Sequence, residues 1–284
     1  MKTRRIICAL LAVLLLASLG AAAAEAEQDH EAVTYLDLGG QKLKYNAVRS
    51  MLEQYPNLQK VDMFDTVITP AQADELTGQF PGIEFGWTIK FCKDHVVRTD
   101  ATAFSTLHFS GDKGHSTKDI SVLRYCRKLK ALDFGHNLVD DISWLEELPD
   151  LRVLIIAVNR ITDLSPLANL ENLEYLEVFS NRVTDISPLQ GLEHLTDLNI
   201  GYNRIGDFSP LCGMTQLKRL WLFRAGNRGI PGVPQDVIDT LKETLPGTQI
   251  NWKSEPTLGG WRDHPHYDTI KEMFQGTWYI PFTD

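Results

Sequence analysis

Few residues in this chain have the types and spacing that catalysis or metal binding requires. His264 and His266 flank a proline without a third ligand nearby, so they do not make a metal site. Aspartates recur every 22 residues, at Asp141, Asp163, Asp185 and Asp207. A Ca²⁺ site would need several oxygens at one point, so we assign this column to the turns that follow it. We predict no metal and no cofactor.

One pair of carboxylates, Asp133 and Glu177, could support hydrolysis of a glycoside. If they lie two strands apart in a parallel sheet, their separation is about 10 Å. That is at the edge of the range of about 6.5–9.5 Å for inverting hydrolases. Nothing in the sequence raises the pKa of either group, and no hydrolase, metalloprotease, P-loop or dinucleotide motif is present. We predict that the chain is not an enzyme, with a glycan-binding or carbohydrate-processing accessory as the alternative.

The elements that must position these residues come from an internal repeat. The chain restarts every 22 residues on the pattern L-x-x-L-x-L-x-x-N-x-I-x-D-I-S-P-L-x-x-L-x-x, from Leu129, Leu151, Leu173, Leu195 and Leu217. The first six positions predict a short strand, and successive strands stack into a parallel sheet. Few residues remain before the next leucine, so the return must be a 3₁₀ or single helical turn.

Two polar positions of the repeat have structural roles. A buried amide can satisfy backbone groups of neighbouring turns where each strand ends, at Asn137, Asn159, Asn181 and Asn203. Serine precedes proline in three units, as at Ser165, and this pair is typical of a helical N-cap and first turn. We expect Asn181→Ala to lower the melting temperature and Glu177→Ala to leave it unchanged.

The repeat resembles the bacterial leucine-rich repeat family, specifically the internalin type with its N-x-I-x-D-I-S-P-L signature, over residues 129–224. Segments Pro56–Met63, Arg98–Leu107 and Gly259–Tyr267 also resemble secreted repeat proteins of gut Firmicutes, which bring no assigned activity. The resemblance implies an α/β leucine-rich repeat solenoid. Its parallel β-sheet would form the concave face, and short 3₁₀ or α turns would form the convex face.

Looser units on both sides predict one solenoid from about Val33 to Trp252. Strand frames begin at Val33, Leu58 and Phe104, helices are predicted over 45–55, 70–80 and 233–245, and a last strand over 248–252. The predicted divisions are a signal peptide (1–24), an N-terminal capping region of irregular β-α repeats (25–128), the regular repeats (129–224), a C-terminal capping repeat (225–252) and an aromatic-rich tail (253–284).

The side chains on the concave face are the candidate binding residues, because the x positions of each strand point away from the core. They are Tyr175, Glu177, Phe179, Asn199, Tyr202, Arg219, Trp221 and Phe223. Aromatic and Arg side chains dominate interface hot spots, so we predict a protein ligand, with Trp221→Ala weakening its binding and sparing the fold. The alternative is that the aromatic tail folds back over this face, and then Trp221→Ala destabilises the protein.

The N-terminus predicts export. Basic residues at Lys2, Arg4 and Arg5 precede an apolar run over 6–19 and small residues over 21–24, the plan of a secretory signal peptide. No other apolar stretch approaches the roughly 20 residues of a membrane span.

Charge and cysteine content narrow the class further. The net charge is −9, and without residues 1–24 it is −12, from 25 Lys and Arg against 37 Asp and Glu, which argues against nucleic-acid binding. Cys92, Cys126 and Cys212 are too few for a disulfide framework, and whether two of them pair is left open. The sequence as a whole predicts a secreted, non-enzymatic monomer that recognises a protein on a host or bacterial surface.

Overall fold

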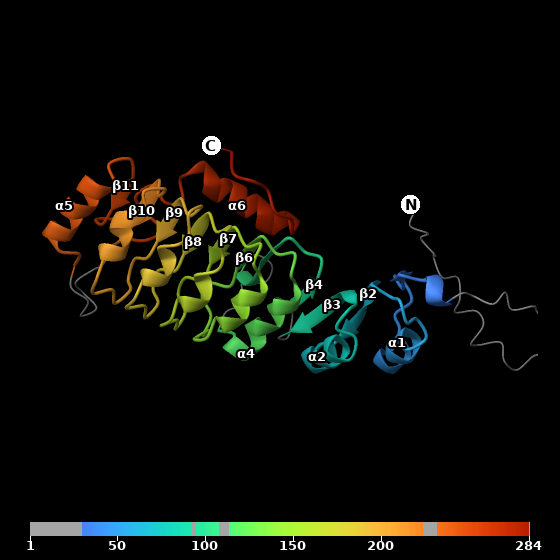
Figure 1. Cartoon of the computed structure of the whole chain (residues 1–284). Helices are drawn as coiled ribbons and strands as arrows, with labels where there is room; N and C mark the ends of the chain where they lie inside the picture. The colour runs from blue at the N-terminus through green and yellow to red at the C-terminus, as the bar shows by residue number, and fades with distance from the viewer. Residues whose placement is uncertain (1–29, 92–94, 108–113, 224–231, 284) are drawn as a thin grey trace, which may run out of the picture. The chain divides into compact units, whose positions relative to one another are not determined.

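The computed structural model describes residues 30–91, 95–107, 114–223 and 232–283, so the predicted signal peptide lies outside the described residues. The chain forms two units, Met1–Thr99 and Asp100–Asp284, with separate sheets (Figure 1). The predicted single solenoid from Val33 to Trp252 is therefore wrong. The predicted N-terminal region of residues 25–128 is divided between the two units.

Unit 1 has a four-stranded sheet and two helices. Its elements are a 3₁₀ turn (His30–Ala32), β1 (Tyr35–Asp37), α1 (Tyr45–Leu52), β2 (Lys60–Ile68), α2 (Pro70–Gln79), β3 (Glu84–Phe91) and β4 (His95–Arg98). Strands β1, β2 and β3 are parallel, whereas β4 pairs antiparallel with β3 and ends the parallel ladder. Helix α2 begins at the predicted cap, where Thr69 and Gln72 exchange hydrogen bonds.

Unit 2 has a seven-stranded parallel sheet in the order β11-β10-β9-β8-β7-β6-β5. The strands are β5 (Ala103–Ser105), β6 (Ala131–Asp133), β7 (Val153–Ile155), β8 (Tyr175–Glu177), β9 (Asp197–Asn199), β10 (Arg219–Trp221) and β11 (Gln249–Asn251). Helical elements are α4 (Thr117–Ile120), α5 (Gln235–Thr244), α6 (Pro265–Gly276) and 3₁₀ turns at Ser121–Tyr125, Ser143–Glu147, Ser165–Leu167, Ser187–Leu189 and Ser209–Gly213.

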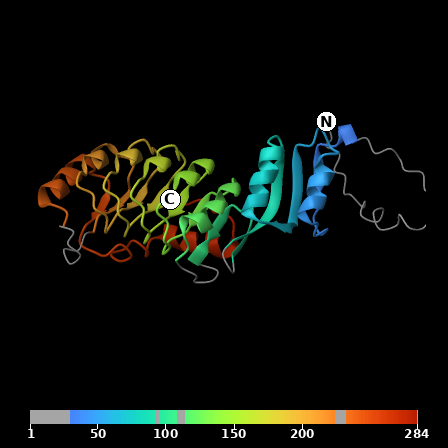
Figure 2. The ribbon, with the colours of Figure 1, turned by 90° about the horizontal axis from the view of Figure 1, so that it is seen from below.

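Figures 1 and 2 show the short turns in a row along one side of this sheet and α6 along the other. The repeat core lies between the sheet and the turns. It receives the middle residue of each strand, such as Leu154, Leu176 and Leu198, together with the leucines and isoleucines of the turns, all fully or nearly fully buried.

The predicted asparagine ladder is confirmed. Asn181 Oδ1 accepts from the backbone N–H of Ile161 at 3.0 Å, and its Nδ2 donates to the carbonyls of Ile156 and Val178, both at 2.9 Å. Asn159 and Asn203 make the same contacts in their own repeats. Each amide thus joins the turn before it to its own strand.

The caps of the four 3₁₀ turns that begin at Ser143, Ser165, Ser187 and Ser209 differ from the prediction. Serine is the first residue of the turn, and the aspartate two residues earlier accepts from its N–H, as Asp163 Oδ1 does from Ser165 at 2.8 Å. Asp185 and Asp207 do the same, and hydrogen bonding from the serine lowers the pKa of both carboxyls. The aspartate column therefore belongs to the turns, as expected.

The first repeat of unit 2 is shifted from the predicted frame. Phe104 pairs in register with Leu132, not with Leu129, so the expected frame starting at Phe104 is wrong by three residues. A polar residue, Thr106, is fully buried directly after β5 in this first repeat, and its Oγ1 accepts from Asn137 Nδ2 at 3.2 Å. A search for apolar residues at fixed spacing does not find this position, because a threonine occupies it.

Candidate binding face of unit 2

The concave face is the sheet face opposite the 3₁₀ turns, and two rows of side chains cover it. The first residues of the strands form one row and the third residues the other. The rows change along the sheet from small and apolar side chains to aromatic and charged ones. They are Ala103, Ala131, Val153, Tyr175, Asp197 and Arg219, and Ser105, Asp133, Ile155, Glu177, Asn199 and Trp221.

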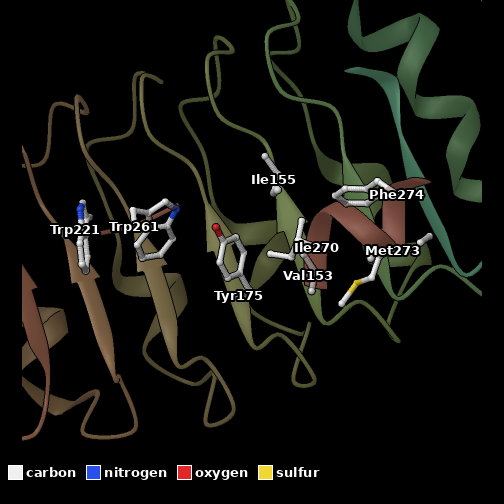
Figure 3. Close-up of a cluster of buried hydrophobic side chains, with 10 residues drawn as sticks. Val153, Ile155, Tyr175, Trp221, Trp261, Ile270, Met273 and Phe274 are labelled. Atoms are coloured by element: carbon white, nitrogen blue, oxygen red, sulfur yellow. The ribbon is translucent and has the colours of Figure 1, made fainter. Parts of the chain in front are cut away.

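The chain's own C-terminal tail, residues 253–283, lies on this face. Helix α6 begins after His264, whose Nδ1 accepts from the N–H of His266, and Pro265 occupies its first turn. Its buried residues Ile270, Met273 and Phe274 have the spacing of one helix face, and they pack on the small apolar strands (Figure 3). The cluster they complete contains Ala103, Ala131, Val153, Ile155, Tyr175, Trp221, Trp261, Ile270, Met273 and Phe274.

Trp261 is the deepest aromatic residue of the tail. It is fully buried between Tyr175 and Trp221, with ring centroids 5.3 Å and 5.1 Å away (Figure 3). Its indole Nε1 donates to Glu177 Oε1 at 2.7 Å, and the indole of Trp221 donates to the carbonyl of Leu258 at 3.1 Å. Both buried indoles are therefore satisfied across the interface between tail and sheet.

Glu177 is a fully buried acceptor for several donors. Besides the indole of Trp261, its carboxylate accepts from the Tyr175 hydroxyl and from Arg262 Nη2, the latter at 3.3 Å. Burial and the neighbouring Glu177 charge raise the pKa of Tyr175 well above its ordinary value, so the phenol stays a donor. This carboxylate therefore accepts hydrogen bonds from the indole and the guanidinium of two consecutive tail residues, Trp261 and Arg262.

Asp197 is the second buried carboxylate that the tail contacts. Its oxygens pair with Arg219 Nε and with His266 Nδ1, the latter at 3.0 Å. Burial alone would raise the pKa of Asp197, but the hydrogen bond from His266 and the charge of Arg219 hold it below its ordinary value. The His266 ring also stacks on Phe282 of the tail, with centroids 4.1 Å apart.

Three sheet side chains donate to main-chain carbonyls of the tail. Asn199 Nδ2 contacts Pro256 O at 2.8 Å, Arg219 Nη1 contacts Trp261 O at 3.1 Å, and Trp221 holds the carbonyl between them. Backbone carbonyls exist in any polypeptide, so these three contacts do not depend on the tail's side chains. The tail's side chains are contacted instead by the carboxylates of Glu177 and Asp197.

The structure brings most of the predicted ligand-binding residues together beneath the tail. Six of them, Tyr175, Glu177, Phe179, Asn199, Arg219 and Trp221, are buried. Tyr202 and Phe223 are half-buried and meet edge to face, and the Tyr202 hydroxyl donates to Glu255 at 3.4 Å. The expectation that this face is open to solvent is wrong for the six buried residues, and the alternative that the tail covers it is confirmed.

The carboxylate pair proposed for glycoside chemistry is also engaged in structural contacts. Asp133 accepts from Ser105 Oγ at 2.8 Å and from the N–H of Gly135 at 2.9 Å. Burial raises the pKa of Asp133 to about 6, although these hydrogen bonds oppose the rise. With Glu177 fully buried, nothing in this arrangement favours the glycan alternative.

Although a folded-back tail was one of the two alternatives, the sequence did not single out Trp261, Arg262, His266 and α6 as the parts of the tail that contact this face. The helix had a usable signal, because Pro265 follows a capping residue and Ile270, Met273 and Phe274 fall on one helical face. Within residues 30–91, 95–107, 114–223 and 232–283, no three His, Cys, Asp or Glu residues form a metal-binding group, and no helix is long and apolar enough to cross a membrane.

The fold and its repeats match a known family. Residues 149–191 match the family model for two copies of the leucine-rich repeat, and residues 191–207 match the model for a further copy. Residues 149–207 of the chain are leucine-rich repeats. The predicted solenoid class and its internalin-type units are confirmed, with the sheet of unit 2 as the parallel sheet of the solenoid.

Several solved leucine-rich repeat structures are similar to this one. An internalin (inlF) from Listeria monocytogenes is 26% identical over 72% of this chain, with a TM-score of 0.43, and the chain spans 65% of that protein. Internalin C2 from the same organism is 27% identical over 58% of this chain and 71% of its own, with a TM-score of 0.35. A leucine-rich repeat protein of Leptospira interrogans is 18% identical over 78% of this chain and 51% of its own, with a TM-score of 0.38. No curated protein matches the sequence.

Proposed function

We propose that this leucine-rich repeat protein is a secreted, non-enzymatic monomer that recognises a protein outside the cell, through the concave face of unit 2. The apolar run over 6–19 behind three basic residues supports secretion. The acidic composition supports a protein partner over a nucleic acid. The partner belongs to a host or bacterial surface.

One observation carries the proposal: the concave face already holds a polypeptide. Asn199, Trp221 and Arg219 donate to three carbonyls of the tail, and Glu177 and Asp197 accept from its side chains. A surface that places donors for main-chain carbonyls and specific acceptors along one polypeptide segment has the chemistry of protein recognition.

A photo-crosslinking experiment tests this function. The chain from residue 25 carries p-benzoylphenylalanine at Phe223, at the half-buried edge of the candidate face, and is mixed with bacterial and epithelial surface proteins. The matched control carries it at Glu193, which is exposed beyond the 3₁₀ turn Ser187–Leu189.

We expect one protein to crosslink from position 223 and not from position 193, and to bind the unlabelled chain when purified. Equal crosslinking from both positions, or binding to a glycan array with no protein captured, contradicts the proposal.

A further inference from the structure

The interface between the tail and the sheet is separate from the repeat core. The middle row of the strands, including Leu154, Leu176 and Leu198, is buried against the turns. The tail contacts the two outer rows and residues beside the strands, such as Thr102 and Tyr202. The asparagine ladder involves no tail residue. The repeat core is therefore formed without the tail, and the tail packs on the opposite face of the sheet.

Besides its apolar cluster, the tail is held by contacts to two carboxylates that regain hydration when the tail leaves. Glu177 and Asp197 each pair with a basic group of the tail, Arg262 and His266. The cost of removing such charges from water offsets most of their attraction, so buried ion pairs specify a partner more than they stabilise it. These contacts therefore select the groups that the tail presents, and another segment with the same groups would meet the same acceptors.

Two adjacent glycines of the tail, Gly259 and Gly260, have positive φ, and of these two only Gly259 lacks room for a Cβ. Gly259 has φ +66°, and a Cβ there would lie 2.4 Å from Asn251 Nδ2 and 2.5 Å from Ser254 Cβ. Its carbonyl accepts from Asn251 Nδ2 at 3.3 Å. An alanine at position 259 would strain the docked path. The side chains that it would displace, Asn251 of β11 and Ser254, lie outside the two rows that β5 to β10 form.

We propose that residues 255–283 are a tethered competitor for a peptide-binding site on the concave face. The site's external ligand is a segment of a partner protein that presents an aromatic N–H donor followed by a cationic residue. This inference rests on the proposed function and adds the partner's chemistry and its regulation. Asn199, Arg219 and Trp221 hold the ligand backbone, and Glu177 reads the tryptophan-arginine pair that the tail supplies as Trp261 and Arg262.

Peptide binding to the full chain from residue 25 tests the proposal. The probe is a fluorescein-labelled synthetic peptide of residues 255–284, titrated by anisotropy into the wild type and the Gly259→Ala variant. The matched control is Gly247→Ala, because Gly247 has room for a Cβ and no positive φ. Circular dichroism and sedimentation velocity check that each protein is folded and monomeric.

Gly259→Ala should bind the peptide at least tenfold more tightly than the wild type and Gly247→Ala. Adding Glu177→Gln, or replacing the peptide's Trp-Arg pair by Ala-Ala, should remove at least tenfold of that affinity. Equal binding by the wild type and a folded Gly259→Ala overturns the proposal. Dimers formed by exchange of tails also overturn it, because a second copy would then be the occupant.

Hydrogen exchange of the wild type covers the case in which Gly259→Ala does not fold. Amides of α6 should exchange through openings that leave β7, β8 and β9 protected, whereas simultaneous exchange of helix and strands overturns the proposal.

The competitor proposal and the proposed function are contradicted by different results. A surface protein that binds the wild type and Gly259→Ala equally keeps the proposed function and overturns the competitor. If Gly259→Ala binds the tail peptide but no surface protein, the competitor is kept and the proposed function is overturned.

Discussion

The indole of Trp261 donates a 2.7 Å hydrogen bond to Glu177, 84 residues earlier in the chain. Both side chains are fully buried, so neither faces a solvent-filled groove. The bond places a tail residue at the centre of the surface on which leucine-rich repeat proteins present their strand side chains. The concave face of unit 2 is therefore an occupied surface.

Trp221→Ala should destabilise unit 2. Trp221 is fully buried against Trp261, and removing a buried tryptophan side chain typically costs about 3–5 kcal/mol. Thermal and urea unfolding measure the loss. The matched control is Trp278→Ala, because Trp278 is 59% exposed and its removal should change the unfolding free energy little. Equal unfolding of the two variants would show that Trp221 is not covered.

Asn181→Ala should also destabilise the repeats. It removes an amide that satisfies the Ile161 N–H and two carbonyls, and an unsatisfied buried backbone group costs about 1–3 kcal/mol. The exposed neighbour Arg182→Ala is the control for urea unfolding. The earlier expectation that Glu177→Ala leaves stability unchanged is replaced, since Glu177 holds donors from Tyr175, Trp261 and Arg262.

Asp133→Asn should stabilise the protein at neutral pH more than at pH 4. The folded protein raises the pKa of Asp133 from 3.8 to about 6, so the native state binds this proton more tightly than the unfolded state. Stability from the protonated carboxyl is present below pH 4 and is lost as pH rises towards 6. The substitution should gain on the order of 3 kcal/mol more at pH 8 than at pH 4.

Urea unfolding at both pH values measures this difference, with Asp150→Asn at an exposed position as the control. A gain for Asp133→Asn that does not depend on pH would mean that the carboxyl is already ionised at pH 4.

Val158→Asn should raise the stability of unit 2. Val158 has φ 57°, in the left-handed region that β-branched residues avoid and asparagine tolerates. His136, Ser180 and Tyr202 adopt the same conformation in the other repeats, so the turn demands it. We expect a gain of about 1 kcal/mol in urea unfolding. Leu138→Asn, at an exposed position without positive φ, should bring no such gain.

The repeat could be predicted from the sequence because its contacts recur at a fixed spacing. Leu154, Leu176 and Leu198 occupy one row because each lies 22 residues after the last, and Asn159 and Asn181 follow the same period. The frame of β5 was mispredicted because Thr106 stands where later repeats have an apolar residue. The strand pattern also predicted which side chains, from Tyr175 to Trp221, lie on the candidate face.

What covers that face could not be derived from the period. Trp261 and Glu177 lie 84 residues apart, and Tyr279 and Thr102 177 residues apart, with no repeat relating them. An exposed row of aromatic side chains fits a partner and a folded-back tail equally well. The geometry of the buried donors and acceptors distinguishes the two for this chain.

The indole N–H resonance of Trp261 tests the docked tail most directly. In ¹⁵N-labelled chain from residue 25, Trp261→Phe identifies the resonance by its loss. The structure predicts slow solvent exchange and nuclear Overhauser contacts to the rings of Tyr175 and Trp221, whose centroids lie 5.3 Å and 5.1 Å from that of Trp261. A sharp resonance at the position of a solvent-exposed indole, with rapid exchange and no such contacts, would contradict the account.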